Sequence, residues 1–336
     1  MRYRKLGRTG ADVSEIIFAC GETLGLMSGD DDETQHRVVK SALDAGINCF
    51  DTAARAANGK AEENLGRILK DLERQPLICT KVHIDPADTK DLPGQIERAL
   101  HASLKRLQVD RIDLYQLGNW IEGGVSEQAL RTGDILGPTG AIASIEKMRD
   151  QRLTKWVGIT ALGDTGLCRR LIESGRIDTA QVFLNAINPT AVHHVARRTL
   201  DATRRQPSRG QDLTGLIDTC VEKNVGVIAI RTLAAGAMVG YMTDYASRIV
   251  TKDTDVDDVT RKALKVRELV GDRFGNFAQA AVRFALSFPG ISCIDYTANT
   301  MPHLTEGVEA VDMGPLPETA LEELQALHQS DFGAKA

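Results

Sequence analysis

Ionisable and amide side chains stand at the ends of several short apolar runs in this sequence. These positions are Asp51, Lys81, His83, Asn119, Thr160, Gln181, Asn185 and Arg231, with Gly118 beside Asn119. If the runs are strands of a parallel barrel, their carboxyl ends converge on one open mouth, where reactive groups sit. The sequence therefore predicts one site that several neighbouring strands build together.

Asp51 and Lys81 are the first two catalytic candidates in this set. A partly buried lysine needs a carboxylate partner or loses its proton. Two interpretations remain open. The two residues form a structural ion pair, or Lys81, desolvated in an apolar mouth, acts as an acid, a base or an electrostatic clamp.

His83 is the third catalytic candidate, because residues 81 and 83 of a strand project from the same face. It lies one step nearer the rim and could supply a proton there, although a solvated histidine at a strand end is the common alternative. Arg55 and Arg231 could bind an anionic group of a substrate, or be ordinary surface and loop arginines.

The elements that must position these residues follow a regular alternation of short apolar runs and amphipathic stretches of helical length. Such alternation predicts parallel strands joined by helices. The expected strands are Ile16–Cys20, Asn48–Asp51, Leu77–Val82, Ile112–Leu117, Trp156–Thr160, Thr179–Leu184, Val225–Arg231 and Ile291–Tyr296. Eight repeats predict an α/β fold of the (β/α)8 TIM-barrel type, as a single domain over residues 1–336. Residues 2–14 are expected to form an N-terminal β-hairpin that closes the barrel floor.

Three stretches are too long or too polar for ordinary connections between these elements. They are Gly123–Pro138, Arg198–Asp212 and Gly240–Arg273, the last with helical spacing at Val259, Ala263, Val266 and Leu269. We expect helical and loop insertions at the barrel mouth from these stretches.

Composition narrows the class of partner. The net charge of -5 offers no basic face for a phosphate backbone, so we expect a small-molecule substrate and no nucleic acid. No run approaches the roughly 18 apolar residues that span a bilayer, so we expect a cytoplasmic protein without a membrane partner. The six cysteines lack metal or C-x-x-C spacing and are expected to be reduced core residues, with no metal site.

Six segments occur in order along nearly the whole chain. They are RYRKLGRTG from Arg2, AGINCFDTA from Ala45, EENLG from Glu62, TKV from Thr80, RIDLYQL from Arg111 and VGIT from Val157. Together they resemble the signature segments of the aldo-keto reductase superfamily. The resemblance implies carbonyl reduction with NADPH, using a tyrosine as proton donor, a lysine and an aspartate that tune it, and a histidine that orients the carbonyl.

Matched by motif, Asp51 takes the place of that aspartate and Lys81 that of the lysine. The tyrosine is expected five residues after the aspartate, where Ala56 stands, and the histidine after Gln116-Leu117, where Gly118 stands. A positioned proton donor contributes about 10² to 10⁴ in rate, and neither alanine nor glycine donates from a side chain. The sequence therefore predicts a divergent member with an incomplete catalytic tetrad.

For the cofactor, the resemblance implies that Thr160 and Gln181 meet the nicotinamide carboxamide, with Asn185 near the same strand end. Arg231 is a further cofactor-binding candidate. The turn after the last strand offers Thr297, Asn299 and Thr300 as hydrogen-bond donors but no Arg or Lys to pair with a 2′-phosphate. The cofactor choice between NADP and NAD therefore stays open.

Three functional hypotheses follow. The first is an NADP(H)- or NAD(H)-dependent oxidoreductase that acts on a carbonyl or alcohol. The second is a non-redox enzyme, such as a lyase, isomerase or dehydratase, built on Asp51, Lys81 and the rim arginines. The third is a non-catalytic binding or partner subunit that keeps the barrel.

Overall fold

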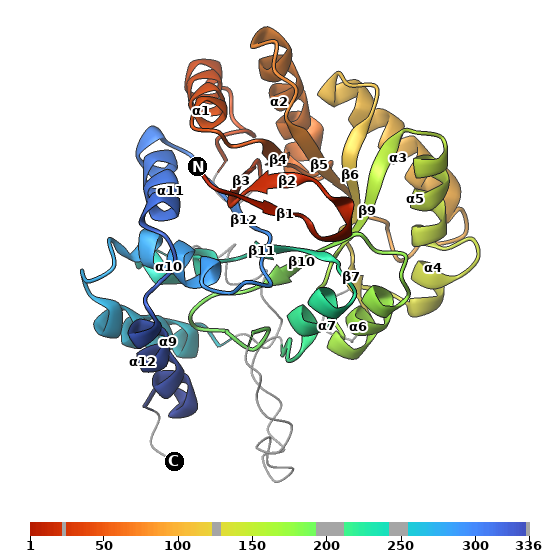
Figure 1. Ribbon diagram of the computed structural model, residues 1–336. Coiled ribbons are helices and arrows are strands. Elements are labelled where there is room, and N and C mark those ends of the chain that lie inside the picture. The colour runs from red at the N-terminus through yellow and green to blue at the C-terminus, as the bar shows by residue number, and fades with distance from the viewer. Residues whose placement is uncertain (22–24, 123–128, 193–211, 242–254, 334–336) are drawn as a thin grey trace.

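Eight parallel strands form a closed barrel in the computed structural model, which describes residues 1–21, 25–122, 129–192, 212–241 and 255–333 (Figure 1). Around the barrel the order is β3-β4-β5-β6-β9-β10-β11-β12. The bounds are β3 Ile16–Ala19, β4 Cys49–Asp51, β5 Leu77–Val82, β6 Ile112–Leu117, β9 Thr154–Thr160, β10 Thr179–Phe183, β11 Gly226–Ile230 and β12 Cys293–Tyr296. The (β/α)8 prediction is confirmed, and every predicted strand overlaps an observed one.

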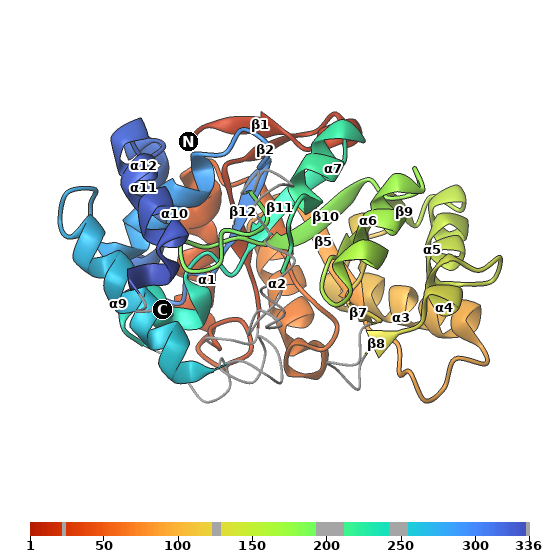
Figure 2. The same ribbon diagram turned by 90° about the horizontal axis from the view of Figure 1, so that it is seen from below.

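Helices follow the strands and surround the barrel (Figures 1 and 2). Their bounds are α1 Asp32–Asp44, α2 Lys60–Asp71, α3 Leu92–Leu107, α4 Thr132–Leu136, α5 Ala141–Asp150, α6 Thr165–Glu173, α7 Leu216–Glu222, α9 Val256–Val270, α10 Phe277–Leu286, α11 Met301–Met313 and α12 Glu318–Gln329. In α1 the carboxylate of Asp31 accepts from the backbone N–H of Thr34 at 3.0 Å and so caps the helix start. Val38, Val39 and Ala42 then form its buried face.

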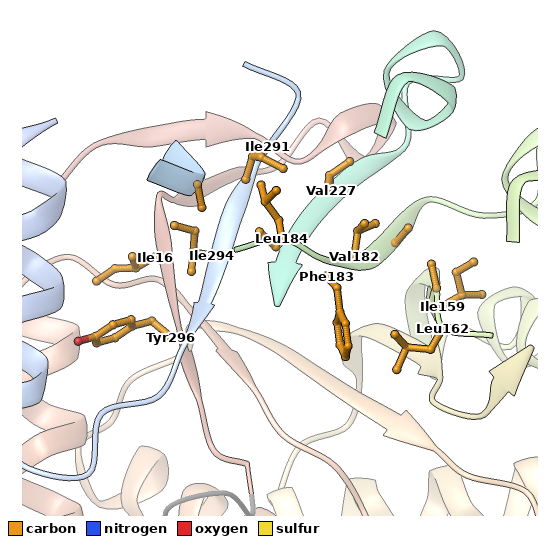
Figure 3. Packing of buried hydrophobic residues seen from close by; sticks show 14 of the residues in the cluster. Ile16, Ile159, Leu162, Val182, Phe183, Leu184, Val227, Ile291, Ile294 and Tyr296 are labelled. Carbon is orange, nitrogen blue, oxygen red and sulfur yellow. The ribbon is translucent and has the colours of Figure 1, made fainter. Parts of the chain in front are cut away.

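Outward-pointing side chains of the strands pack beneath these helices. Val182, Val227 and Ile294 belong to this layer, and Figure 3 shows them along β10, β11 and β12. Inward-pointing residues alternate with them and fill the lumen. This alternation explains why the sequence shows short continuous apolar runs, since both faces of each strand are buried over most of its length.

The hairpin β1 (Tyr3–Lys5) and β2 (Asp12–Ser14) closes the end of the barrel where the strands begin (Figure 2). Leu6 and Val13 reach into the apolar lumen cluster. Gly7 has φ +51°, and a Cβ built on it would lie 2.2 Å from the backbone nitrogen of Gly226. Only glycine permits this close approach of two backbones.

The three predicted insertions are described in part. In the first, β8 (Ala129–Leu130) pairs with β7 (Trp120–Ile121), and α4 follows, while residues 123–128 lie outside the described residues. The second lies outside them except for Asp212. In the third, the helical spacing is confirmed by α9, which packs against α10, α12 and the 3-10 helix η3 (Ala234–Val239), while residues 242–254 are outside the described residues.

All six cysteines are reduced and buried, as expected. Cys49 and Cys79 lie on adjacent strands with their sulfur atoms 3.5 Å apart. Across the described residues, no helix combines the length and apolar character needed to cross a bilayer.

Glu15 joins the hairpin to the rest of the chain and is only 4% exposed. Arg4 donates from Nε to Oε1 of Glu15 at 2.7 Å, and Arg2 donates from Nε to Oε2 at 2.9 Å. The other nitrogens of Arg4 donate to the carbonyl oxygens of Leu286 at 2.9 Å and Ile291 at 3.0 Å. Arg4 therefore fastens the hairpin to the end of α10 and to the segment that leads into β12.

We expect Arg4→Met to lower the free energy of unfolding by about 2 to 4 kcal/mol, because Glu15 keeps one charged partner and three carbonyl groups, those of Leu286, Phe288 and Ile291, lose their donor. Urea denaturation measures the change. Lys5→Met is the matched control, since Lys5 pairs with Asp12 on the exposed surface and such pairs contribute about 0 to 1 kcal/mol. Equal and small effects in both variants would contradict a fastening role for Arg4.

Candidate active site

Inward-facing residues of the strands form layers inside the barrel. The apolar layer contains Ile17, Cys49, Cys79, Leu114, Trp156, Ile228 and Cys293. Two residues further along the strands, and therefore on the same face, the polar layer contains Asp51, Lys81, Gln116, Gly158 and Asp295. The dry apolar layer separates this polar layer from the closed floor of the barrel.

Asp51 connects residues from three other strands. It is 3% exposed and accepts hydrogen bonds at Oδ2 from Nζ of Lys81 and from Nε2 of Gln181, the latter at 3.0 Å. Lys81 also donates to the carbonyl oxygen of Thr52 at 3.2 Å. Thr160 donates to Oε1 of Gln181 at 3.2 Å. The structure thus brings four predicted site residues, from β4, β5, β9 and β10, into one hydrogen-bonded chain across the lumen.

Lys81 carries its charge in this setting. Burial disfavours the ammonium form, but the neighbouring acidic groups, Asp51 first among them, outweigh burial and raise the pKa of Lys81. Its Nζ is therefore a hydrogen-bond donor and a positive charge. This favours the ion pair and the electrostatic clamp over a lysine that acts as a base.

His83 lies directly over Gly118. A Cβ built on Gly118 would lie 2.4 Å from Cε1 and 2.5 Å from Nε2 of the imidazole, so the ring fills the space that a side chain at residue 118 would need. Asn119 holds the segment in place, since its side chain accepts from the backbone N–H of Ile84 and donates to its carbonyl oxygen, both at 2.7 Å. The ring of His83 is thus mostly buried and held in position against Gly118, unlike a solvated histidine at a strand end.

The environment of His83 also fixes its protonation state. Burial, followed by the positive charges of Arg55 and Lys81, lowers the pKa of His83 to about 3. The imidazole is therefore neutral across the physiological range. Its single N–H takes part in a hydrogen bond with the backbone of Gly118, and the neutral ring carries no extra proton to give away.

Asp295 is the ionisable residue of this layer that the sequence analysis missed. It lies on β12, and burial together with the charge of Asp51 raises its pKa well above the usual value for a carboxyl group. The signal in the sequence is a single acidic residue inside the apolar run Ile291–Tyr296, in phase with Cys293.

A cavity of about 670 Å³ opens beside this layer at the carboxyl ends of β10, β11 and β12. Its walls include Gln181, Arg231, Asp295 and Thr297, and η3, α10 and α11 complete them. Arg231 and Ala235 in the wall have φ +60° and +56°. Non-glycine residues in this conformation store backbone strain, which tends to be found at ligand sites.

The predicted cofactor residues occupy different places around the cavity. Gln181, Arg231 and Thr297 line it, and Thr160 reaches it through Gln181. Asn185 lies outside the lining and donates to the carbonyl oxygen of Arg231 at 3.0 Å, so it supports the strained segment. Thr300 caps α11 by accepting from the backbone N–H of His303 at 3.3 Å, and Asn299 precedes it without lining the cavity. Their roles toward a cofactor stay predictions.

The two positions that break the expected tetrad are both enclosed. Ala56 begins the 3-10 helix η2 (Ala56–Gly59) and is 1% exposed. Gly118 follows β6, and its backbone N–H donates to the carbonyl oxygen of Val82 at 2.8 Å.

Known proteins resemble this chain along almost its full length. An uncharacterized oxidoreductase of Bacillus subtilis, YqkF, is 21% identical over 99% of this chain and 98% of its own. The holo form of the aldo-keto reductase AKR11C1 from Bacillus halodurans has a TM-score of 0.71 at 20% identity, covering 97% of this chain and 96% of that one. An aldo/keto reductase from Klebsiella pneumoniae in complex with NADP and acetate has a TM-score of 0.67 at 18% identity, covering 97% and 95%.

The family comparison matches the Aldo/keto reductase family over residues 23–329, a range that includes every strand of the barrel except β3 and all the site residues described above. The closed parallel barrel, its hairpin floor and its strand-end site agree with that match. This chain belongs to the aldo/keto reductase family.

Proposed function

We propose that this protein is a nicotinamide-dependent oxidoreductase that interconverts a small carbonyl compound and its alcohol. One observation carries the proposal. Gln181 lines the strand-end cavity and also donates a hydrogen bond to Asp51, so it links the cavity to the Asp51–Lys81 pair. Family membership and the NADP named for the Klebsiella structure support a nicotinamide cofactor in this position.

The lining residues fit such a cofactor chemically. A volume of about 670 Å³ is typical of pockets for small molecules and cofactors. Gln181 and Thr160 offer amide and hydroxyl groups to a carboxamide, Arg231 offers a guanidinium group to a pyrophosphate, and Thr297 offers a hydroxyl group further along. When bound, the reduced cofactor supplies the hydride.

His83 and Lys81 act on the carbonyl group in this proposal. The imidazole of His83 packs beside the carbonyl group and limits its orientation, and the charge of Lys81 stabilises negative charge that develops on the carbonyl oxygen. His83 would thus perform from β5 the orienting role that the sequence resemblance assigns to residue 118. Arg55, close enough to lower the pKa of His83, favours substrates with an anionic group.

The non-redox enzyme and the non-catalytic subunit are the competing hypotheses, and neither requires a nicotinamide. We expect NADH or NADPH to bind with a Kd below about 1 mM, measured by fluorescence titration. Arg231→Met should weaken binding at least about tenfold, because it removes a charge-assisted hydrogen bond. Arg37→Met on the exposed face of α1 is the matched control. Failure of both nucleotides to bind the wild-type protein would refute the proposal.

The neutral state of His83 has a consequence for stability. Because its folded-state pKa of about 3 lies below the unfolded value, stability is full above about pH 6.5 and is lost as the pH falls toward 3. Between pH 7.5 and pH 5 the wild type should lose about 2 kcal/mol more unfolding free energy than His83→Gln, which does not titrate. Urea denaturation at both pH values tests this, and parallel losses would show that His83 titrates normally.

Gly118→Ala should displace the ring of His83, since the added methyl group would overlap it. We expect reduction of short aldehydes to fall at least about tenfold while cofactor affinity stays unchanged. Gly133→Ala is the control, because a Cβ at Gly133 meets nothing within 4 Å. Full activity in Gly118→Ala would mean that the placement of His83 has no part in catalysis.

A further inference from the structure

The polar layer of the lumen holds more carboxyl groups than it can ionise. Asp51 and Asp295 come from β4 and β12, and both face this layer, close enough for the charge of Asp51 to raise the pKa of Asp295. Among the described residues, Lys81 forms an ion pair with Asp51, and its positive charge also acts on Asp295. Two adjacent carboxylates in a low-dielectric site repel each other strongly, so such pairs retain one proton.

The unpaired oxygen atoms of the two carboxyl groups also indicate a retained proton. Oδ2 of Asp51 receives Lys81 and Gln181, but Oδ1 of Asp51 and Oδ1 of Asp295 are both buried without a donor from the described residues. A buried acceptor without a donor costs about 1 to 3 kcal/mol. Two carboxyl groups can hydrogen-bond to each other only if one carries a proton, so a retained proton provides the missing donor.

Asp295 is the carboxyl group of this pair that faces the ligand space. It lines the cavity of about 670 Å³ together with Gln181, whereas Asp51 is 3% exposed and lies behind Lys81 and Gln181. A proton held by the pair therefore reaches a ligand in the cavity from Asp295.

We propose that Asp295 is a catalytic residue of this protein, whose carboxylic acid group gives the proton to the carbonyl oxygen of the substrate during reduction. This inference rests on the proposed function. Ala56 has no side-chain proton to donate, and the neutral His83 carries no extra proton. Asp295 therefore takes the role of proton donor in this proposal.

The step transfers one hydride and one proton to the carbonyl group. Hydride from the reduced nicotinamide forms a C–H bond at the carbonyl carbon, the C=O π bond breaks, and the oxygen takes the proton of Asp295 to become a hydroxyl group. The substrate is reduced, the nicotinamide is oxidised, and Asp295 is left as a carboxylate beside Lys81. A proton from solvent in the cavity restores the acid, and alcohol oxidation runs the same step in reverse.

The groups that face Asp295 set the direction of its pH dependence. They are Asp51 and Lys81 from neighbouring strands, the thiols of Cys20 and Cys293, and Arg231, His303 and Glu306 across the cavity. Burial keeps both thiols protonated by raising their pKa. The reduction rate should fall as the pH rises through the raised pKa of Asp295, because the acid form is then lost.

Asp295→Asn is the test variant, because the amide keeps the size of the side chain and can donate a hydrogen bond to Asp51. At pH 7 the infrared spectrum of the wild type should contain the carbonyl band of an un-ionised carboxyl group. The variant should lack this band, so the band should appear in the difference spectrum of the two proteins. Asp71→Asn, at the exposed end of α2, is the matched control and should leave the band in place. Absence of the band in the wild type would overturn the proposal.

Single-turnover kinetics test the transfer step. Asp295→Asn should bind the cofactor with an affinity within twofold of the wild type and should reduce the substrate about 100-fold more slowly. Its reduction rate should no longer decline at high pH. Its thermal stability should not fall at pH 8, because a raised folded-state pKa means that the wild-type carboxyl group contributes less stability as the pH rises.

The outcomes separate the two proposals. A wild type that binds no nicotinamide would refute the proposed function and the transfer step with it. A wild type that binds cofactor and reduces aldehydes, with an Asp295→Asn variant that does so at more than half the rate, would overturn the role of Asp295 alone.

Discussion

A positive charge enclosed in a barrel lumen is the constraint on which the site depends. The ammonium group of Lys81 is stable there because Asp51 and the carbonyl oxygen of Thr52 surround it. The same carboxylate holds Gln181, which in turn holds Thr160. Four strand ends are thereby fixed relative to one another, above an apolar layer that keeps water out from below. Catalytic groups need such rigid support.

The charged groups of the lumen also set one another's protonation states. Arg55 and Lys81 work with burial to keep His83 neutral, while Asp51 and burial favour the protonated form of Asp295. Lys81 stays charged because its ion pair with Asp51 outweighs burial. Under the proposals above, a neutral imidazole, a fixed cation and a carboxylic acid are available together, and carbonyl reduction needs the last two.

His83 and Gly118 illustrate how neighbouring strands exchange roles. By resemblance, residue 118 is the histidine position, and glycine there is a loss when the sequence is considered position by position. In the structure, the absence of a side chain at residue 118 is what admits the imidazole of His83 from β5. The space is filled from the adjacent strand, and the clamp of Asn119 on Ile84 holds that strand end in place.

The sequence by itself determined the barrel, because the alternation of apolar runs and amphipathic helices is local and repeats eight times. It also identified Asp51 and Lys81, which stand at or beside the end of a run, and Gln181, which the family resemblance assigns to the cofactor. Only the tertiary structure decided that His83 covers Gly118 and that Asp295 meets Asp51, residues 244 positions apart in numbering. Those contacts depend on strand register and on closure of β12 against β3, which no local pattern encodes.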